Sequence, residues 1–571
     1  MKNLLVPAIL LLLIVGYAVA VYPQPCNDDI YCYGDILHTV TLAEPFDDRK
    51  TYVDLPLKNP RPVIKSNFQN MMANTSNNPS VDDVKRFLNE NFGERGEELT
   101  SWDPVDWKPN PEFLNLIQDE TLRQFGSELN ALWKELGKVI KPEVRDNPDM
   151  FSLVYLPNPV ILPGGRFLEL YYWDTYWIIR GLIHCQMLQS VKGMLQDFLL
   201  LLDTYGYVPN GNRIYYSRTQ PPFLIQMFKD YVDATGDLTF LENSLPSLEK
   251  EFDFWMSNRS VSVSSTEPNG TVQNYTLFRY INEVTGPRPE SYSREYVLAE
   301  TLESTQQRDD FYMNMKSGAE SGWDFSSRWF PLNDSANSSL LATKTSQVIP
   351  VDLNSIIYKN AKILVDFNNL LNNTAAAQKY EETAEEIKSA INSLLWDEAA
   401  GVWFDYDLQE HVRRKQFYPS NIFPLWAGIG CNDSSIVQRV LDYIQDSQVL
   451  NWEGGIPTSL VNSSQQWDFP NAWPPLQHLF VESLDNSGYE PAKVVAFDIA
   501  QKWVSNNYLT YKRYNNTMFE KYRADLPGEP GGGGLYDVVV GFGWTNGVII
   551  DFLQKYGQRL SSFYNDLRFI L

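Results

Sequence analysis

The stretch TAAAQKYEETAEEIKSAINSLLW, residues Thr374 to Trp396, is the clearest indication of the fold class of this chain. Its larger apolar residues recur mostly at steps of three and four, and they are Tyr380, Ala384, Ile387, Ile391, Leu394 and Leu395. This spacing places an apolar stripe along one side of a helix that has about 3.6 residues per turn. The pattern therefore predicts an amphipathic helix over Thr374 to Trp396.

Two further stretches show the same helical spacing. One runs from Phe113 to Ile140, and the other is PAKVVAFDIAQKWV at residues 491–504. Alternation with a period of two is scarce and brief, as in GVWFDYD at residues 401–407. The sequence therefore predicts a mainly helical protein, in which long loops carry clusters of Gly, Pro, Trp and acidic residues.

The first twenty residues, MKNLLVPAILLLLIVGYAVA, combine one lysine, an apolar run from Leu4 and the small-x-small sequence Ala18-Val19-Ala20. This combination is typical of a secretory signal peptide, so we expect a secreted protein whose mature chain begins near Val21. No later segment offers about twenty uninterrupted apolar residues, so we expect no membrane anchor. Within residues 21–571 no Pro/Ser/Gly linker or low-complexity tract divides the chain, which favours one large domain.

Ten Asn-x-Ser/Thr sequons agree with the secretory route and predict N-linked glycans. They begin at Asn74, Asn258, Asn269, Asn274, Asn333, Asn337, Asn372, Asn432, Asn462 and Asn515. Four cysteines are too few for a disulfide scaffold, although Cys26 and Cys32 lie close enough to pair in an oxidising compartment. Cys185, in the apolar run GLIHCQML, is expected to be a buried free thiol, and Cys431 remains undecided.

The charge balance narrows the class of ligand. Against 47 Lys and Arg there are 71 acidic residues, and the formal net charge is −24. This charge repels nucleic acid and anionic membranes, so a neutral or cationic ligand fits better. Aromatic residues make up 14% of the chain, and many stand beside Gly, Pro, Asn or an acid. That arrangement is typical of sugar-binding clefts and equally of a large core with aromatic loops.

Several kinds of chemistry are excluded by the motifs that the sequence lacks. Its four histidines form no HExxH motif, and no Cys/His cluster has zinc-ligand spacing. It contains neither a GxSxG elbow nor a Gly-Lys-Ser/Thr phosphate loop. Zinc catalysis, serine nucleophiles and nucleotide chemistry are therefore not expected. The remaining candidates are carboxylates, arginines and tryptophans.

Two clusters place such residues close together. In AESGWDFSSRW, residues 319–329, Asp324 stands between Trp323 and Phe325. It is either an ion-pair partner of Arg328 or an acid whose pKa has been raised for catalysis. In PGGRFLELYYWDTYWIIRG, residues 163–181, a helix from Arg166 onward would align a set of side chains on one side. The set is Arg166, Glu169, Trp173 and Trp177, and its alternative interpretation is an Arg166–Glu169 ion pair with buried tryptophans.

Three more clusters have both a functional and a structural interpretation. VPNGNRIYYSRTQPP, residues 208–222, carries Asn210, Arg213 and Arg218, and could be an ordinary turn. TGPRPESYSRE, residues 285–295, carries Arg288 and Glu290, and could hold a surface ion pair. QQWDFPNAWPP, residues 465–475, could be a packed aromatic turn, and it carries Gln466, Asp468 and Trp473.

Together these motifs resemble those of a known family. PGGRF followed by YYWD, and QWD-x-P-x-Ala-Trp-x-Pro, resemble the two signatures of the trehalases of the inverting glycoside hydrolase type. ESGWDFSSRW, PRPESY and GGGG-x-Y followed by GFGWTNG are similar to that family as well, and the resemblance runs from about Tyr31 to Leu553. The N-terminal CNDDIYCYGDILHTV resembles the animal members, particularly those of insects.

The resemblance implies a fold and an activity. The expected fold is all-α, an (α/α)6 barrel of six inner and six outer helices preceded by an N-terminal extension, with the site at one mouth of the ring. The expected activity is hydrolysis of α,α-trehalose to two glucose molecules, with inversion and without metal or cofactor. It further implies Asp324 as the general acid and Glu520, in MFEKY, as the general base. The implied substrate-binding residues are Arg166, Trp173, Asp174, Asn210, Arg218, Arg288, Glu290, Gln466 and Trp473.

Two positions depart from the family pattern. Only Ser217 separates Tyr216 from Arg218, where the family usually has two residues, and Leu535 follows the four glycines where the family usually has Glu. Leucine cannot accept the hydrogen bond that a carboxylate there would accept from a sugar hydroxyl. Two alternatives therefore stay open, a secreted sugar-binding protein without turnover and a related inverting enzyme that acts on another α-glucoside.

Overall fold

The computed structural model describes residues 24–266, 270–332, 339–534 and 536–562. Several of the sequence-based expectations concern residues outside these ranges. They are the signal peptide at residues 1–20 with the start near Val21, the sequons at Asn269, Asn333 and Asn337, and Leu535.

Six helices form a closed inner ring, in which each helix contacts the next and the last contacts the first. In order around the ring they are α7 (Asp174–His184), α9 (Leu224–Thr235), α13 (Val351–Leu370), α15 (Phe423–Ala427), α17 (Pro474–Asp485) and α19 (Gly543–Tyr556). Most residues of α7, α13, α17 and α19 are buried, because these helices have neighbours on nearly every side.

Six further helices lie outside this ring and alternate with the inner helices along the chain. They are α5 (Glu120–Leu136), α8 (Leu188–Tyr205), α10 (Leu238–Asn258), α14 (Thr374–Ala390), α16 (Ser434–Asp446) and α18 (Glu490–Arg513). Helices α5 and α16 bury one stripe of apolar residues and expose the opposite side, as the sequence spacing requires. Side chains of Asp119, Asp237 and Asp433 accept hydrogen bonds from the first turns of α5, α10 and α16. The expected (α/α)6 barrel is confirmed.

The three helices predicted from spacing are present, with differences at their boundaries. Helix α14 begins at Thr374, continues through a π-helical turn (Ile391–Leu395) and gives way to a short strand at Trp396. Residues 491–504 lie inside α18. In the stretch from Phe113 to Ile140, a separate 3-10 helix (Glu112–Leu116) comes first, and α5 begins only at Glu120 and ends at Leu136. Gly137–Ile140 forms a strand because it pairs with Leu99–Ser101.

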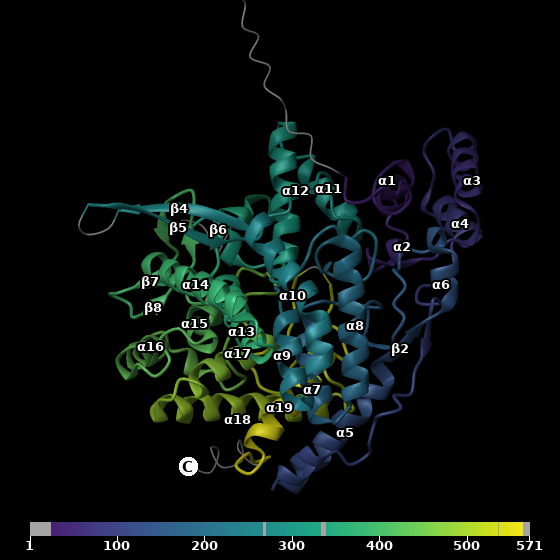
Figure 1. Ribbon diagram of the computed structural model, residues 1–571. Helices are drawn as coiled ribbons and strands as arrows, with labels where there is room; N and C mark the ends of the chain where they lie inside the picture. Colours follow the sequence, from purple (N-terminus) through teal and green to yellow (C-terminus); the bar gives the residue numbers. More distant parts are fainter. Residues whose placement is uncertain (1–23, 267–269, 333–338, 535, 563–571) are drawn as a thin grey trace, which may run out of the picture.

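Short antiparallel strands join the helices. One sheet contains β1 (Leu99–Ser101), β2 (Gly137–Ile140) and β3 (Val160–Ile161), and another contains β6 (Val348–Ile349), β9 (Tyr406–Asp407) and β10 (Val412–Arg413). The two-stranded pairs are β4 (Ser260–Thr266) with β5 (Val272–Phe278), β7 (Trp396–Asp397) with β8 (Val402–Trp403), and β11 (Asn471–Ala472) with β12 (Tyr522–Arg523). The hairpin of β4 and β5 projects from the barrel in Figure 1. The pairing of β11 with β12 matters most for function, since it brings the loop before Trp473 beside Glu520.

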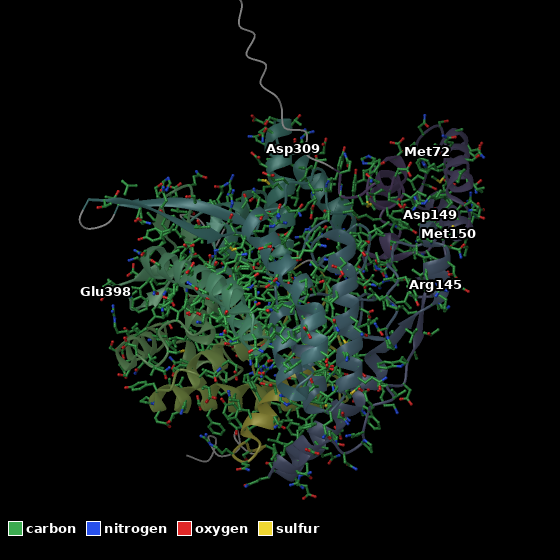
Figure 2. All side chains as sticks on the ribbon, in the orientation of Figure 1. Met72, Arg145, Asp149, Met150, Asp309 and Glu398 are labelled. Carbon is green, nitrogen blue, oxygen red and sulfur yellow. A yellow bond between two sulfur atoms is a disulfide. The ribbon has the colours of Figure 1, made fainter. Side chains whose placement is uncertain are left out.

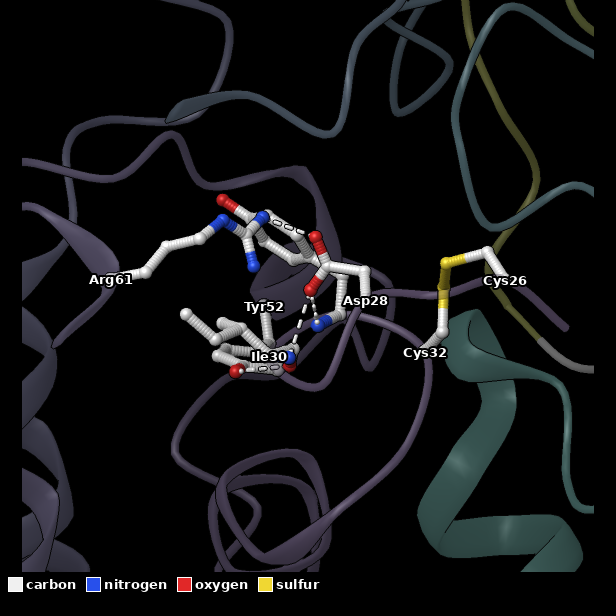
Figure 3. The surroundings of a disulfide bond; sticks show 7 residues. Cys26, Asp28, Ile30, Cys32, Tyr52 and Arg61 are labelled. Atoms are coloured by element: carbon white, nitrogen blue, oxygen red, sulfur yellow. Dashed lines mark hydrogen bonds and ion pairs between the residues drawn. A yellow bond between two sulfur atoms is a disulfide. The ribbon is translucent and has the colours of Figure 1, made fainter. Parts of the chain in front are cut away.

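The N-terminal part of the chain forms a second apolar cluster beside the barrel. Its helices are α1 (Asp35–Leu42), α2 (Thr51–Asp54), α3 (Arg61–Asn74) and α4 (Val81–Asn91). A disulfide joins Cys26 to Cys32, and nearby the Asp28 carboxylate accepts hydrogen bonds from backbone amides and pairs with Arg61 (Figure 3). The proposed Cys26–Cys32 pairing is therefore confirmed. Cys185 is a buried free thiol, as expected, and Cys431 is a half-buried one.

The other α-helices in the described part of the chain are α6 (Pro142–Asp146), α11 (Tyr292–Ala299) and α12 (Thr305–Glu320). Helix α12 begins at the surface, near Asp309, and its buried C-terminal half leads to Asp324 (Figure 2). Among the described residues, no helix combines the length and the apolar character that a membrane span needs.

Candidate active site

A cavity of ≈ 690 Å³ opens at the end of the barrel where α7, α17 and α19 begin. Ten of the eleven residues predicted for the site line it. They are Arg166, Trp173, Asp174, Asn210, Arg218, Arg288, Glu290, Asp324, Trp473 and Glu520. The volume suits a small-molecule ligand. Because helix N-termini carry partial positive charge, the three helices also favour the acids gathered at this mouth.

Asp324 stands in the loop that follows α12, between the buried rings of Trp323 and Phe325. Its side chain is 29% exposed, and that exposed part opens into the cavity. Burial raises the pKa of this carboxyl to about 6, although the nearby Arg288 and Arg218 act in the opposite direction. An acid with this pKa keeps a substantial protonated fraction near neutral pH.

The alternative interpretation of Asp324 as the partner of Arg328 is wrong. The Arg328 guanidinium is fully buried and binds two other carboxylates, Asp352 at 2.8 Å and Asp405 at 2.7 Å. A bidentate guanidinium already satisfied by two acids has no need of a third. Asp324 instead lies 3.5 Å from Nη1 of Arg288.

The helix from Arg166 onward that would align Arg166, Glu169, Trp173 and Trp177 does not form. Gly164 and Gly165 have φ values of 127° and 55°, which bend the chain, and the helix begins only at Asp174. Tyr171 instead forms an isolated β-bridge with Gly211, so the segment before α7 is extended rather than helical.

The ion pair suggested between Arg166 and Glu169 does not form either. Both oxygens of Asp48 accept hydrogen bonds from Arg166, at 2.9 and 2.6 Å. Glu169 is buried and binds Lys50 at 2.8 Å and Arg213 at 2.9 Å. Of the two arginines, only Arg166 reaches the cavity, so Arg213 has a structural role.

Two arginines and an acid form the wall next to Asp324. Nη2 of Arg218 donates to Glu290 at 2.7 Å, and Nη1 of Arg288 lies 3.9 Å from the same carboxylate oxygen. Burial raises the pKa of Glu290, but Arg218 and Arg288 outweigh it and hold that pKa below its usual value. The TGPRPESYSRE motif is therefore a buried charge cluster, and the surface ion pair considered for it is wrong. Arg218 reaches the cavity despite the shortened loop.

Glu520 faces the cavity from the turn before β12. Its Oε2 accepts a hydrogen bond from Nζ of Lys521 at 2.9 Å, and its Oε1 accepts one from the Tyr536 hydroxyl at 2.7 Å. Its backbone carbonyl accepts from Nε1 of Trp544 at 3.0 Å, which fixes the turn. The two donors to the carboxylate fix its orientation.

Asp174 is the first residue of α7 and also lines the cavity. Burial, reinforced by the nearby charges of Glu520 and Asp324, raises its pKa well above its usual value. A protonated Asp174 can donate a hydrogen bond to a ligand oxygen, which an ionised carboxylate cannot do.

Gln466 is the one predicted site residue that does not line the cavity. Its Nε2 donates to the backbone carbonyl of Asp324 at 2.7 Å, and its Oε1 accepts from Lys521 at 3.1 Å. Asp468, next but one along the chain, is fully buried and binds the hydroxyls of Ser326, Ser327, Ser459 and Ser463. The QQWDFPNAWPP loop therefore holds the backbone of Asp324 from the side that faces away from the cavity.

The tryptophans are mainly part of the core. Trp473 and Trp173 line the cavity, but they are only 1% and 4% exposed. Trp473 stacks on Trp467 with ring centres 3.8 Å apart, so the loop is also the packed aromatic turn considered for it. Trp177 is fully buried beneath Trp173. Most of each ring is covered by protein, so these tryptophans belong to the core as well as to the cavity wall.

Sequence reasoning missed several residues that line the cavity or lie directly behind its wall. Tyr536 and Lys521 stand next to residues already singled out, so the motifs GGGGLYD and MFEKY carried a usable signal. Asp48 of the N-terminal segment, which holds Arg166, had no such signal. Asp47, Arg49, Arg294 and Asp537 line the cavity as well.

The described lining of the cavity includes no histidine or cysteine. Elsewhere, buried His478, Glu482 and Asp551 have ligand atoms within 4.8 Å of one another. Arg180 binds Asp551 at 2.9 Å and Lys555 binds Glu482 at 2.6 Å, so cationic side chains already neutralise these acids. This cluster lies apart from the residues that line the cavity.

Comparison with known proteins agrees with this geometry. The sequence model of the trehalase family matches residues 44–557. The chain is 45% identical to a trehalase of Apis mellifera, covering 98% of this chain and 90% of that one. It is 44% identical to a trehalase of Homo sapiens, covering 97% and 94%.

A solved structure, the neutral trehalase Nth1 of Saccharomyces cerevisiae, superimposes with a TM-score of 0.56 over 69% of this chain and 73% of that one. Its sequence is 24% identical, so it supports the barrel fold alone. The family match and the two near full-length relatives establish more than the fold: this chain belongs to the trehalase family of glycoside hydrolases.

Proposed function

We propose that this protein is a secreted α,α-trehalase, which hydrolyses trehalose to two glucose molecules with inversion at the attacked carbon. The observation that carries the proposal is the contrast between two carboxyls in one cavity. Burial raises the pKa of Asp324 to about 6, whereas both oxygens of Glu520 accept hydrogen bonds from Lys521 and Tyr536. A pair of carboxyls in such different environments suits a general acid and a general base.

In the proposed reaction Asp324 donates its proton to the glycosidic oxygen as the bond to the anomeric carbon breaks. Glu520 takes a proton from a water molecule, which attacks the opposite face of the same carbon. One product glucose therefore leaves with its anomeric configuration inverted. No step of this scheme needs a group from outside the protein other than water.

The other cavity residues would bind the hydroxyls of the disaccharide. Arg166, Arg218 and Arg288 offer fixed donors, and Asn210, Glu290 and Asp174 add both donors and acceptors. The edges of Trp173 and Trp473 would contact the C–H faces of the sugar rings. Gln466 acts indirectly, by donating a hydrogen bond to the backbone carbonyl of Asp324.

Three features support secretion and N-glycosylation. The N-terminal twenty residues have the form of a signal peptide. The Cys26–Cys32 disulfide suits an oxidising compartment. Glycans need accessible asparagines, and those of seven sequons are exposed in the described structure, namely Asn74, Asn258, Asn274, Asn372, Asn432, Asn462 and Asn515.

We expect the purified mature protein to release glucose from trehalose, and not appreciably from maltose or sucrose, with no loss of activity in EDTA. The described cavity lining offers carboxylates and arginines but no histidine or cysteine for a metal. Glucose release with each substrate is the measurement. Equal activity on maltose would favour the alternative of another α-glucosidase. Binding of trehalose without turnover would favour the alternative of a sugar-binding protein. Inhibition by EDTA would contradict the metal-free scheme.

The pH profile should show which form of Asp324 is active. Because the acid must carry its proton, kcat/KM for trehalose is expected to fall as pH rises through about 6, the pKa of the buried Asp324 carboxyl. A substrate whose leaving group needs no proton, α-glucosyl fluoride, should lack this basic limb. A basic limb that is the same for both substrates would mean that another group is titrating.

A further inference from the structure

Both oxygens of the Glu520 carboxylate are held by one neighbour each. Nζ of Lys521 donates to Oε2 at 2.9 Å, and the Tyr536 hydroxyl donates to Oε1 at 2.7 Å. Lys521 is fully buried and does not line the cavity, whereas Tyr536 does. The lysine therefore reaches the carboxylate from the protein side and cannot contact a bound sugar.

Lys521 also connects Glu520 to the acid on the other side of the cavity. Its Nζ donates to Oε1 of Gln466 at 3.1 Å, and Nε2 of Gln466 donates to the backbone carbonyl of Asp324 at 2.7 Å. Trp473 covers the lysine with a cation–π contact of 4.8 Å and donates from Nε1 to the Gln466 carbonyl at 2.9 Å. The side chains of Lys521 and Gln466 thus form a continuous hydrogen-bonded bridge from Glu520 to the Asp324 backbone.

We propose that Lys521 and Tyr536 are positioning residues that hold the Glu520 carboxylate aimed into the cavity, and that the Lys521–Gln466 bridge sets the distance between Glu520 and Asp324. The inference rests on the proposed function, in which Glu520 is the general base. An inverting pair must keep room for a water molecule, so the separation of its carboxyls has to be fixed. A bridge of buried, mutually bonded side chains provides that rigidity.

The groups around Glu520 leave Lys521 as its cationic neighbour. Asp174 and Asp324 are acids of the same cavity. Arg166 lies over the Tyr536 ring at 4.4 Å, but its guanidinium is engaged by Asp48. Lys521 is therefore the cation in direct contact with Glu520. Tyr536 remains a donor, since burial and the Glu520 charge raise the pKa of its hydroxyl well above the usual value.

The test replaces Lys521 with methionine, which keeps the length of the side chain and removes its charge. We expect kcat for trehalose to fall on the order of 10²-fold, because loss of the lysine leaves the general base Glu520 out of position. KM should stay within about threefold of the parent, since the lysine does not touch the sugar. The acid limb of the kcat/KM profile should move to higher pH, because the ionised base loses its cation. Hydrolysis of α-glucosyl fluoride should fall as much as that of trehalose, since water must be activated for both.

Tyr536→Phe provides a second variant that keeps the ring and removes only the hydroxyl. It should also lower kcat on both substrates and shift the acid limb in the same direction, by a smaller amount because a neutral donor is lost. This variant keeps the inference testable if Lys521→Met fails to fold, which its melting temperature and circular dichroism will show.

Matched controls use the same substitutions away from the cavity. Lys502→Met removes a buried lysine of α18 that donates to the Leu450 carbonyl and pairs with Asp498. Tyr443→Phe removes a half-buried hydroxyl on α16 that donates to Asn421. Both controls are expected to keep the parent kcat and the parent pH profile, whatever they do to the melting temperature.

The outcomes separate this inference from the proposed function. If Glu520→Gln abolishes turnover while Lys521→Met and Tyr536→Phe fold and keep the parent kcat and acid limb, the positioning roles are wrong and Glu520 remains the base. A loss confined to trehalose, with α-glucosyl fluoride unaffected, would also overturn them, because it would show that the lysine acts on proton donation. If Glu520→Gln keeps full activity, the proposed function itself fails.

Discussion

Replacement of Asp324 with asparagine is expected to slow hydrolysis of trehalose by at least about 100-fold, while binding of the sugar persists. Asparagine keeps the size and shape of the side chain but has no proton to give to the glycosidic oxygen. The leaving group of trehalose is a sugar hydroxyl, which departs slowly unless it is protonated. Initial rates of glucose release, together with calorimetric titration of trehalose, measure the two effects separately.

The same variant should hydrolyse α-glucosyl fluoride much better than trehalose, because fluoride departs without protonation by the enzyme. This comparison is the control for misfolding, since a damaged site would lose its activity on both substrates. If Asp324→Asn retained its activity on trehalose, or lost activity on the two substrates to the same degree, Asp324 would not be the general acid.

The stability of Asp324→Asn provides an independent check on the raised pKa. The folded protein binds the Asp324 proton more tightly than the unfolded chain does, so the native carboxyl lowers stability as pH rises from about 4 to above 6. Asparagine resembles the protonated form and does not ionise. The variant should therefore melt at a higher temperature than the parent at pH 7 and at a similar temperature near pH 4. An equal melting temperature at pH 7 would contradict the proposed shift.

Replacement of Glu520 with glutamine is expected to have an equally large effect, a loss of at least about 100-fold, on trehalose and α-glucosyl fluoride alike. Glutamine cannot take a proton from water, and water must be activated whichever group leaves. It also leaves Lys521 without its carboxylate partner, so the melting temperature needs to be measured beside the rates. If Glu520→Gln favoured α-glucosyl fluoride over trehalose to the same degree as Asp324→Asn, the assignment of acid and base would be rejected.

The stereochemistry of the parent reaction completes this test. One glucose from each trehalose should appear first as the β-anomer in a proton NMR time course, because water attacks the face opposite the departing oxygen. Initial release of α-glucose alone would indicate a retaining mechanism. In that case Glu520 would have to act as something other than a base on water.

The sequence by itself determined the helical class of the fold and its motifs. Apolar residues at steps of three and four gave α14 and α18 correctly, because the period of a helix is a local property of a short stretch. The same reasoning failed before α7, where Gly164 and Gly165 bend the chain and the helix begins later than expected. Local spacing does not reveal a bend that depends on the backbone conformation of two glycines.

The tertiary structure decided which charges meet. From sequence alone, Arg328 was a plausible partner of Asp324, and Arg166 was a plausible partner of Glu169. In the structure Arg328 binds Asp352 and Asp405 instead. In a chain with 71 acids every arginine has many possible partners, and only the packing of distant segments selects among them. The pairing of β11 with β12 likewise brings Gln466 to Lys521, and so connects the surroundings of Asp324 with Glu520. The raised pKa of Asp324 has the same origin, because burial is a property of the whole fold and not of the residues next to it in the sequence.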